Sequence, residues 1–296
     1  MKVQYSKIPT EGCHPFSLIL DQLPGDKIFD LMVDENRKIP LILNRAKSQI
    51  VAAASLIEAV IHRGGNIFLV GAGTSGRLGV LEAAELPPTF NTPPLLVQAI
   101  IAGGKEAVFQ SQEGAEDNEQ EAVQGVKKSI KRGDLLLGIA ASGVTPFVKR
   151  SLLEGRKLKA KTIFLTCNPQ SPIHFADIII PLDVGPEILS GSTRLKAGTI
   201  TKMVLNMLTT IAMVQLGKVY GNRMVDLQPK SKKLRERGIR IVQELCRVTR
   251  ARALKTLEES EWHVKTAILM IKKNFSYKEA AYQLDNFKGN LRKSLE

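Results

Sequence analysis

Five short, almost continuously apolar runs lie between residues 66 and 182, separated by segments of helical periodicity. The runs are Asn66–Val70, Leu95–Ile101, Asp134–Ala140, Thr162–Thr166 and Asp177–Leu182. Strands that are apolar on both faces and alternate with helices are typical of a parallel sheet covered on both sides. The sequence therefore predicts an α/β fold with a doubly wound, five-stranded parallel sheet, in which a ligand binds at the carboxyl ends of the strands.

Helical segments flank this predicted sheet. Apolar residues at helical spacing predict helices over Asp26–Val33 and Leu41–His62 before it, and a long helix over Leu195–Leu216 after it. Further helices are expected at about 229–253, 256–272 and 276–284, followed by a short tail. We expect two domains: residues 1–237 form the α/β domain with its N-terminal helices, and residues 238–296 form a helical module too small to hold much of a core unless it is docked.

The net charge of the chain is +13, and most of the excess lies near its end, where residues 230–296 hold 17 Lys and Arg against 8 Asp and Glu. One interpretation is a DNA-binding regulator in which Ser276–Leu284 belongs to a helix-turn-helix, with a strongly salt-dependent affinity. However, no run of five basic residues occurs, and only 5% of the residues are aromatic. A solvated helical surface, or a field that attracts anionic sugar phosphates, is the better interpretation, and we expect no nucleic acid as a partner.

The sequence also limits the compartment. Met1–Lys7 lacks the apolar segment of a secretory signal, and the most apolar stretch, Met203–Leu216, carries polar residues that favour a buried helix over a membrane span. The three cysteines, Cys13, Cys167 and Cys246, have neither a disulfide pattern nor a zinc-binding spacing, and the four histidines are scattered singly. We expect a cytoplasmic protein with no metal and no membrane partner.

A glycine-rich loop, Gly71–Arg77, directly follows the first predicted strand and opens a helix. Glycines allow a sharp turn and a close approach to a ligand, and a helix N-terminus presents unpaired N–H groups to an anion. The loop formally matches the dinucleotide pattern GxGxxG, but the next strand ends in Ile101–Gly104 without the acidic residue that a ribose requires. Because Thr74 and Ser75 add hydroxyl groups, a monophosphate is a better ligand than a dinucleotide.

Two further segments place hydroxyl groups at predicted helix starts. In Ala141–Pro146, after the third predicted strand, Thr145 is expected to cap a helix that has Pro146 at its first position. Alone this loop is an ordinary capped turn, but two Ser/Thr-Gly loops on neighbouring strand ends can surround one phosphate. The segment Gly185–Gly198 adds hydroxyl groups and a cation at the start of the long helix, although capping explains it equally well: Ser192, Thr193 and Lys196.

Two glutamates are expected to experience opposite electrostatic fields. Helical geometry is disfavoured before a proline, so the helix that begins near Ser75 is expected to end close to Glu85, before Pro87. The negative end of that helix would favour protonated Glu85, and the positive start of the helix Asn118–Ile130 would favour ionised Glu116. Such a pair is useful for acid–base catalysis at neutral pH. The alternative is that Glu116 only decorates a helix start.

These residues, taken in order, resemble the signatures of N-acetylmuramic acid 6-phosphate etherases. The matching motifs are Gly71–Leu81, Pro87–Thr89, Ala102–Gly104, Glu113–Asp117, Gly138–Gly143, Gly191–Thr199, Lys202–Met207, Gly217–Asn222 and Met224–Asp226. The resemblance begins near Thr10 and implies a sugar-isomerase (SIS) fold, flavodoxin-like in its sheet, with a C-terminal module similar to a small UBA-like helical bundle. The vertebrate glucokinase regulatory protein is similar in fold and loops, but it is longer and non-catalytic.

The resemblance implies a lyase that cleaves the D-lactyl ether of N-acetylmuramic acid 6-phosphate, giving N-acetylglucosamine 6-phosphate and D-lactate for cell-wall recycling. It implies elimination from the open-chain sugar and then water addition, without a metal or another cofactor, in a homodimer that can share its active site. By motif position, Glu116 would remove the C2 proton and Glu85 would assist departure of the lactyl oxygen. Ser75, Ser142 and Thr145 would hold the 6-phosphate. The full set of implied binding residues is Gly73, Thr74, Ser75, Gly76, Ser142, Gly143, Thr145, Glu187, Ser192, Thr193 and Lys196.

The sequence departs from the usual family pattern at four positions. Ala84 and Leu86 stand in place of a serine and a cysteine, Val144 in place of an arginine, and His14 in place of an asparagine. The change at Val144 removes a cation that could contact an anionic group. A non-catalytic sugar-phosphate-binding regulator is the main alternative to the enzyme, because regulators of this fold use similar loops. It would bind hexose 6-phosphates without turnover and keep that binding after Glu116→Ala.

Overall fold

The computed structural model describes residues 8–227, 229 and 231–296. The chain divides into two compact units: the first combines the residues up to Ala84 with Leu95–Thr209, and the second combines Glu85–Pro94 with Thr210–Glu296. Residue 237, where we expect a domain boundary, lies inside helix α9 (Lys232–Cys246) of the second unit. The stretch Met1–Lys7, on which the expectation of no secretory signal rests, lies outside the described residues.

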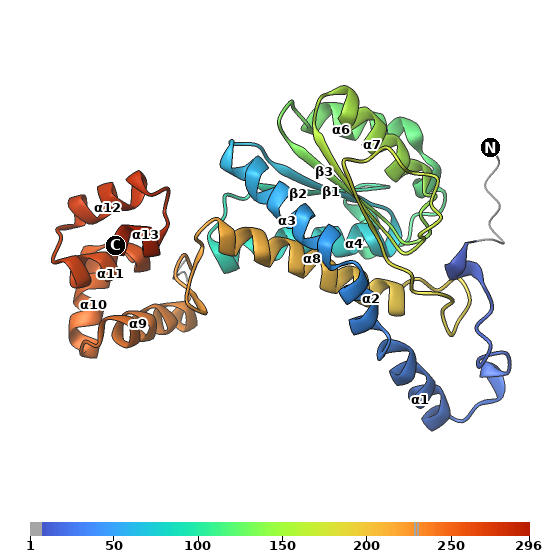
Figure 1. Ribbon diagram of the computed structural model, residues 1–296, viewed down its shortest axis with the longest axis horizontal. Helices are drawn as coiled ribbons and strands as arrows, with labels where there is room; N and C mark the ends of the chain where they lie inside the picture. Colours follow the sequence, from blue (N-terminus) through green and yellow to red (C-terminus); the bar gives the residue numbers. More distant parts are fainter. Residues whose placement is uncertain (1–7, 228, 230) are drawn as a thin grey trace. The chain divides into compact units, whose positions relative to one another are not determined.

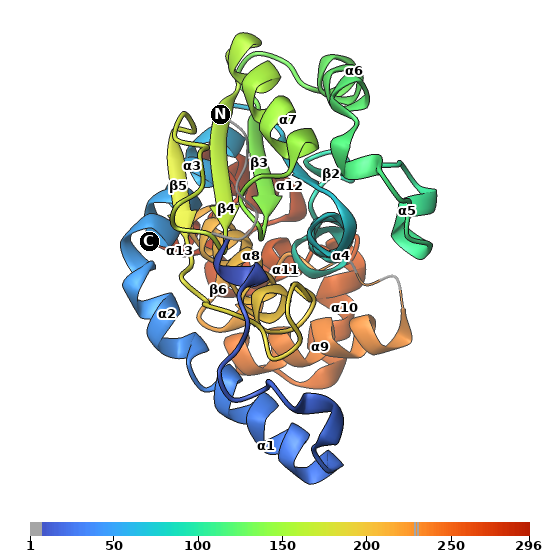
Figure 2. The same cartoon turned by 90° about the vertical axis from the view of Figure 1, so that its right-hand side faces the viewer.

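The first unit is built on a parallel sheet with the strand order β2-β1-β3-β4-β5. Its strands are β1 (Ile67–Gly71), β2 (Val97–Ile101), β3 (Leu135–Ala140), β4 (Lys161–Thr166) and β5 (Ile178–Pro181). All five predicted strands and the parallel α/β fold are confirmed, and Figure 2 shows β2 and β5 at opposite edges. The chain passes from β1 to β2 and returns to β3 on the other side of β1, so the connections after β1 and β3 diverge at a topological switch point.

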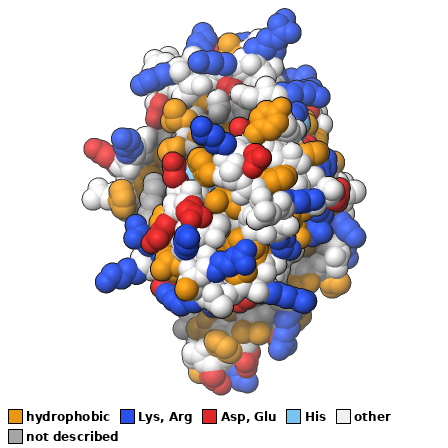
Figure 3. All heavy atoms as spheres, turned by 90° about the vertical axis from the view of Figure 1, so that its left-hand side faces the viewer, with side chains coloured by type: hydrophobic (Ala, Val, Ile, Leu, Met, Phe, Trp, Pro, Cys, Tyr) orange, Lys and Arg blue, Asp and Glu red, His pale blue; other side chains and the backbone are white. Residues whose placement is uncertain are grey.

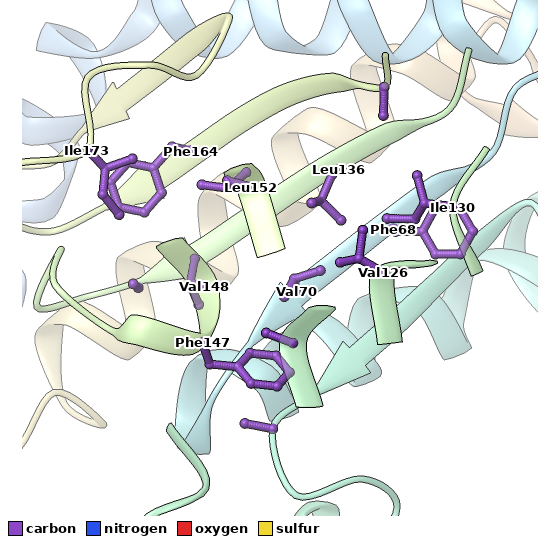
Figure 4. Packing of buried hydrophobic residues seen from close by; sticks show 14 residues of the cluster. Phe68, Val70, Val126, Ile130, Leu136, Phe147, Val148, Leu152, Phe164 and Ile173 are labelled. Carbon is purple, nitrogen blue, oxygen red and sulfur yellow. The ribbon is translucent and has the colours of Figure 1, made fainter. Parts of the chain in front are cut away.

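Side chains that alternate along the strands form a core on each face of the sheet. On one face, Phe68, Leu136 and Phe164 pack against α6 (Glu119–Ser129) and α7 (Pro146–Lys157), as Figure 4 shows. The predicted burial of both strand faces is therefore confirmed on this side by a continuous apolar cluster.

The opposite face is covered by α3 (Lys47–His62), α4 (Gly73–Phe90) and α8 (Lys196–Gln215). Helix α3 contacts β1 and β5, and α4 approaches Leu69 closely at Gly79. Figure 1 shows α8 beside α4. Helix α8 is also the one described helix long and apolar enough to span a membrane, but 56% of its apolar window is buried inside the protein, as in a core helix.

The segment before β1 is helical, as predicted. It contains the 3-10 turns η2 (Pro9–Glu11) and η3 (Leu20–Gln22) and the helices α1 (Gly25–Asn36), α2 (Ile39–Arg45) and α3. Large apolar side chains of this segment are exposed in the single chain, and we call them the N-terminal apolar surface: Phe16, Leu18, Ile19, Phe29, Met32 and Leu41.

Helix α4 does not end near Glu85, so that prediction is wrong. The helix runs through Pro87 and Pro88 to Phe90, and Asn91, at φ 52°, ends it. A proline removes a backbone donor and clashes with the preceding turn. Here both prolines lie in the last turn, the Asn91 N–H still donates to the Pro87 carbonyl oxygen at 3.0 Å, and the buried Phe90 side chain stabilises the end of the helix.

The second unit has a core of its own. After residue 231 it contains α9, α10 (Arg250–Glu259), α11 (Val264–Lys273), α12 (Tyr277–Asn286) and α13 (Leu291–Leu295), preceded by an antiparallel hairpin of β6 (Val219–Tyr220) and β7 (Arg223–Met224). Val225, Val242, Leu257 and Ile268 are fully buried together. The predicted helical character of this part of the chain is confirmed.

Two of the predicted C-terminal helices are interrupted, however. Arg247, at φ 54°, ends α9, so the helix expected over 229–253 is two helices. Glu261 and Trp262, at φ 54° and 65°, likewise separate α10 from α11 within the helix expected over 256–272. A residue with positive φ commonly ends a helix, but arginine, glutamate and tryptophan carry little sequence signal for that conformation.

Basic side chains of the C-terminal unit are dispersed. Figure 3, which looks onto the left-hand side of Figure 1, shows Lys and Arg scattered over that face with acidic and apolar side chains between them. Arg250 donates to both carboxylate oxygens of Glu236, at 2.8 and 2.7 Å, and Arg223 lies 2.6 Å from Glu244. This pattern fits a solvated helical surface better than a continuous nucleic-acid-binding patch.

Candidate active site

The turn from β1 into α4 requires glycine at two positions. A Cβ on Gly71 would lie 2.6 Å from the backbone nitrogen of Gly76, and a Cβ on Gly76 would lie 2.8 Å from the carbonyl oxygen of Gly71. Gly73, at φ 52°, starts α4, so the unpaired N–H groups of the first helical turn face the space beyond the end of β1. Thr74 and Ser75 lie in the same turn, so this turn has the geometry expected of an anion-binding loop.

Residues without a motif of their own hold the loop after β3 in place. Asn168 Nδ2 donates to the carbonyl oxygen of Ser142 at 2.9 Å, and Ser171 Oγ donates to the carbonyl oxygen of Gly143. Gly143 has φ 76°, and a Cβ there would lie 2.8 Å from Ser171. Thr145 takes the N-cap position of α7, but its hydroxyl does not cap the helix and lies 3.5 Å from the Ser142 hydroxyl. The loop therefore offers two neighbouring hydroxyl groups to a ligand.

These two loops meet the segment before α8 in one pocket of about 300 Å³. Val144, where an arginine was expected from the family pattern, lines it, and so do Glu11 and Asp117. Among the described lining residues there is no Lys or Arg, so an anion here would be held by backbone N–H groups and hydroxyls. Of the expected site residues, the pocket brings together Gly73, Thr74, Ser75, Glu116, Ser142, Thr145 and Thr193.

The remaining expected binding residues lie outside this lining. Gly76 and Gly143 shape the two loops, and the backbone N–H of Ser192 donates to Leu189 in the turn before α8. The Glu187 carboxylate accepts hydrogen bonds from the first two backbone nitrogens of α8, at 3.1 and 2.7 Å. Glu187 therefore caps α8, and its expected contact with substrate stays a prediction, as does that of Ser192.

Lys196 is engaged in a buried charge cluster. Its ammonium group, 2% exposed, donates to the Glu35 carboxylate of α1 and, at 3.1 Å, to the Pro186 carbonyl oxygen. His14 Nε2 lies 2.9 Å from the same carboxylate, which also pairs with Lys38. Burial alone would raise the pKa of Glu35, but hydrogen bonds from Lys196, Lys38 and His14 lower it to about 2. Glu35 of α1 thus holds the side chain of Lys196, the first residue of α8.

Glu116 lies in the 3-10 turn η4 (Ala115–Asp117), before α6 begins. Glu116 is exposed as a residue, but partial desolvation of its carboxyl raises the pKa, and repulsion from Asp117 and Glu113 raises it further. The start of the following helix was expected to favour ionised Glu116, but the pKa is raised and not lowered, and α6 begins only at Glu119. A raised pKa makes Glu116 a stronger base.

Glu85 lies on the exposed side of α4 and does not line the pocket. It belongs to Glu85–Pro94, which groups with the second compact unit. Because α4 continues five residues beyond it, Glu85 does not lie at the helix C-terminus, where the sequence placed it. Its role as an acid therefore stays a prediction from the motif alone.

The fold and the pocket define an α/β protein of the SIS type. Residues 114–211 match the SIS domain, and residues 49–154 match the glucokinase regulatory protein N-terminal SIS domain. A solved structure provisionally named a phosphosugar isomerase involved in capsule formation, from Bacteroides fragilis, shares the fold. It is 21% identical, covers 67% of this chain and 93% of its own, and has a TM-score of 0.51.

More similar proteins identify the family within that class. The chain is 45% identical to the N-acetylmuramic acid 6-phosphate etherase of Picosynechococcus sp., over 97% of this chain and 96% of that protein. It is 46% identical to the protein of the same name from Synechocystis sp., over 97% and 95%. The chain belongs to the N-acetylmuramic acid 6-phosphate etherase family.

Proposed function

We propose that this chain is an N-acetylmuramic acid 6-phosphate etherase: a lyase that converts N-acetylmuramic acid 6-phosphate and water into N-acetylglucosamine 6-phosphate and D-lactate. Membership of the family and near-complete coverage of relatives with that name support this activity. The observation that carries it in the structure is the pocket in which the Ser/Thr loops after β1 and β3 meet Glu116. In this pocket the two loops can bind a phosphate, and Glu116 can act as a base on the sugar attached to it.

The phosphate lies against the first turn of α4, where unpaired N–H groups and the hydroxyls of Ser75, Ser142 and Thr145 bind its oxygens. The sugar chain extends from there towards Glu116. In the open-chain form, the aldehyde at C1 acidifies the C2–H bond, so a carboxylate can remove that proton. The pocket therefore orders the substrate by its phosphate and presents C2 to the base.

Glu116 takes the C2 proton, and the electron pair of the C–H bond forms a C2–C3 double bond. The C3–O bond breaks at the same time, and lactate leaves with a proton from Glu85. Water then adds across the double bond: Glu85 takes a proton from the water as its oxygen bonds to C3, and Glu116 returns its proton to C2, so that both carboxyls regain their starting states. The raised pKa of Glu116 supports the role of base, since a carboxyl that titrates nearer to neutral pH accepts a proton more readily.

The protein acts as a homodimer that completes the site around Glu85. The N-terminal apolar surface supports this, because Phe16, Leu18 and Phe29 are 77%, 72% and 66% exposed in the single chain. Soluble monomers rarely leave so many large apolar side chains in water. We place the reaction in the cytoplasm, where a reducing environment keeps thiols such as the exposed Cys13 unpaired.

The test is D-lactate release from N-acetylmuramic acid 6-phosphate by the wild type, Glu85→Ala, Glu116→Ala and, as a matched control, Glu119→Ala. Each of the first two should reduce kcat by at least about 100-fold, as expected for loss of a general acid or base. Glu119 is exposed at the start of α6 and outside the pocket, so its variant should keep wild-type turnover. Binding of N-acetylglucosamine 6-phosphate should survive in all four proteins.

The same experiment separates the enzyme from a non-catalytic regulator of this fold. A folded wild type that binds phosphosugars but releases no D-lactate would contradict the etherase and support the regulator. Turnover that persists in Glu85→Ala would instead assign the proton donor to another group.

A further inference from the structure

The carboxylate of Glu11 lies in the wall of the phosphate pocket, although it precedes the first phosphate loop by sixty residues in the chain. It faces the loop before α8: a Cβ on Gly191 would lie 3.1 Å from Glu11 Oε2. Because Gly191 has no side chain, the Glu11 carboxylate has room beside it. Among the described residues, Glu11 makes no side-chain hydrogen bond or ion pair that would explain its place in the wall.

The backbone around Glu11 is held firmly. The carbonyl oxygen of Thr10 accepts a hydrogen bond from the Gly191 N–H at 3.0 Å, and Ser190 Oγ donates to the carbonyl oxygen of Gly12 at 3.3 Å. Three residues further on, His14 pairs with the buried Glu35. Hydrogen bonds therefore hold the backbone on both sides of Glu11. They place its carboxylate in the pocket wall, although the carboxylate itself makes no such bond among the described residues.

The composition of the pocket decides what this carboxylate can bind. Its lining carries three carboxylates, Glu11, Glu116 and Asp117, and no Lys or Arg among the described residues. A carboxylate repels a phosphate and only accepts hydrogen bonds, so Glu11 cannot share the phosphate with the hydroxyls of the two loops. It can accept hydrogen bonds from the hydroxyl groups of a sugar whose phosphate lies against α4.

We propose that Glu11 is a substrate-binding residue that accepts hydrogen bonds from sugar hydroxyls and so selects phosphosugars over other phosphates. The inference rests on the proposed sugar-phosphate site and deepens it. Glu11 takes no part in proton transfer. Glu11 is exposed when the pocket is empty, and a hydrogen bond to its ionised carboxylate is stronger than one between neutral groups.

The test compares two probes, N-acetylglucosamine 6-phosphate and inorganic phosphate, by calorimetry on the full-length chain. Glu11→Ala should bind the sugar phosphate about 10- to 100-fold more weakly, while inorganic phosphate should bind equally well or better, since a repelling charge is gone. Ser75→Ala should weaken both probes. Asp21→Ala, an exposed carboxylate on the same N-terminal segment, should change neither.

Glu11→Gln keeps an acceptor oxygen and the shape of the side chain, and should recover part of the lost affinity. Equal binding of the sugar phosphate by the wild type and Glu11→Ala, with both proteins folded, would overturn the inference. Parallel loss of both probes in Glu11→Ala would also overturn it, because it would indicate a structural role. A wild type that binds the sugar phosphate without releasing D-lactate would contradict the proposed reaction and leave this comparison valid, whereas a wild type that binds neither probe would overturn both.

Discussion

Glu116 shows how adjacent charges set the chemistry of one side chain. Its pKa is raised first by partial desolvation of the carboxyl and then by the carboxylates of Asp117 and Glu113. Asp117 also lines the pocket, so the repulsion acts at the place where the proton is transferred. Two acidic neighbours therefore contribute to the strength of the proposed base.

Replacing Asp117 with Asn should lower the pKa of Glu116, because it removes a negative charge next to the carboxyl. Glu116 must be ionised to act as a base, so the acidic limb of the kcat/KM profile should move to lower pH, by no more than about one unit. Partial desolvation, the larger cause, remains in the variant. Glu119→Gln provides the control, and a limb that stays in place or moves to higher pH would contradict this account.

Short sequence motifs pointed to the loops after β1 and β3 but not to the side chains that complete the pocket between them. Gly71, Gly73 and Ser75 lie in one turn, so their spacing alone predicts their function. Glu11 and Asn168 reach the site only through the tertiary fold, and no local pattern marks either residue. Lys196 was expected in the pocket because of its position at a helix start, but the partner that holds it, Glu35, lies 161 residues away in the sequence.

At the scale of elements, the Glu35 cluster joins α1 to the start of α8. Glu35 is 6% and Lys196 2% exposed, so each charge depends on the other. Removing one partner of a buried pair leaves an uncompensated charge, which is more damaging than removing both.

Glu35→Gln should therefore lower the free energy of unfolding by about 3–5 kcal/mol in urea denaturation at pH 7. The double variant Glu35→Leu with Lys196→Met should be more stable than Glu35→Gln. Lys38→Ala should cost less than about 1 kcal/mol, because that partner is 55% exposed. A Glu35→Gln protein as stable as the wild type would contradict the importance of the cluster.

The same cluster should make stability depend on pH. Folding lowers the pKa of Glu35 from 4.5 to about 2, so its stabilising contribution is fully present above about pH 4.5 and is lost as the pH falls towards 2. Denaturation of the wild type should become easier over this interval, and the dependence should be smaller in the double variant. An equal dependence in both proteins would assign it to other carboxyls.

The elements themselves were predicted with uneven success, for physical reasons. Strands such as Leu135–Ala140 are apolar throughout, and that pattern is unambiguous in a sheet covered on both faces. The end of α4 was missed because the burial of Phe90 outweighs the effect of two prolines in a last turn. The break at Arg247 was missed because an arginine with positive φ looks like any helical arginine in the sequence.

At the scale of the whole molecule, the proposed dimer is the main feature that the single chain leaves open. Phe29→Glu should convert it to a monomer at micromolar concentration, measured by size-exclusion chromatography with light scattering, since a charge would be buried in an apolar interface. Leu95→Glu is the matched control: Leu95 is also exposed, at 69%, but it belongs to the segment before β2 and not to the N-terminal apolar surface. A wild type that is monomeric would refute the dimer, and a monomeric Phe29→Glu protein with full activity would refute a site shared between subunits.

The described residues of the pocket wall include no basic side chain. The groups that attract anions to the protein are therefore different from the groups that would select one of them in the pocket. The surplus of 13 positive charges on the chain draws every small anion towards the protein, without regard to its shape. In the proposed site, the backbone N–H groups of α4 and the hydroxyls of the β3 loop donate to the phosphate, and the three carboxylates accept hydrogen bonds from the sugar hydroxyls. The proposed site would therefore distinguish anions by their hydroxyl groups, whereas the net charge of the chain distinguishes only their sign.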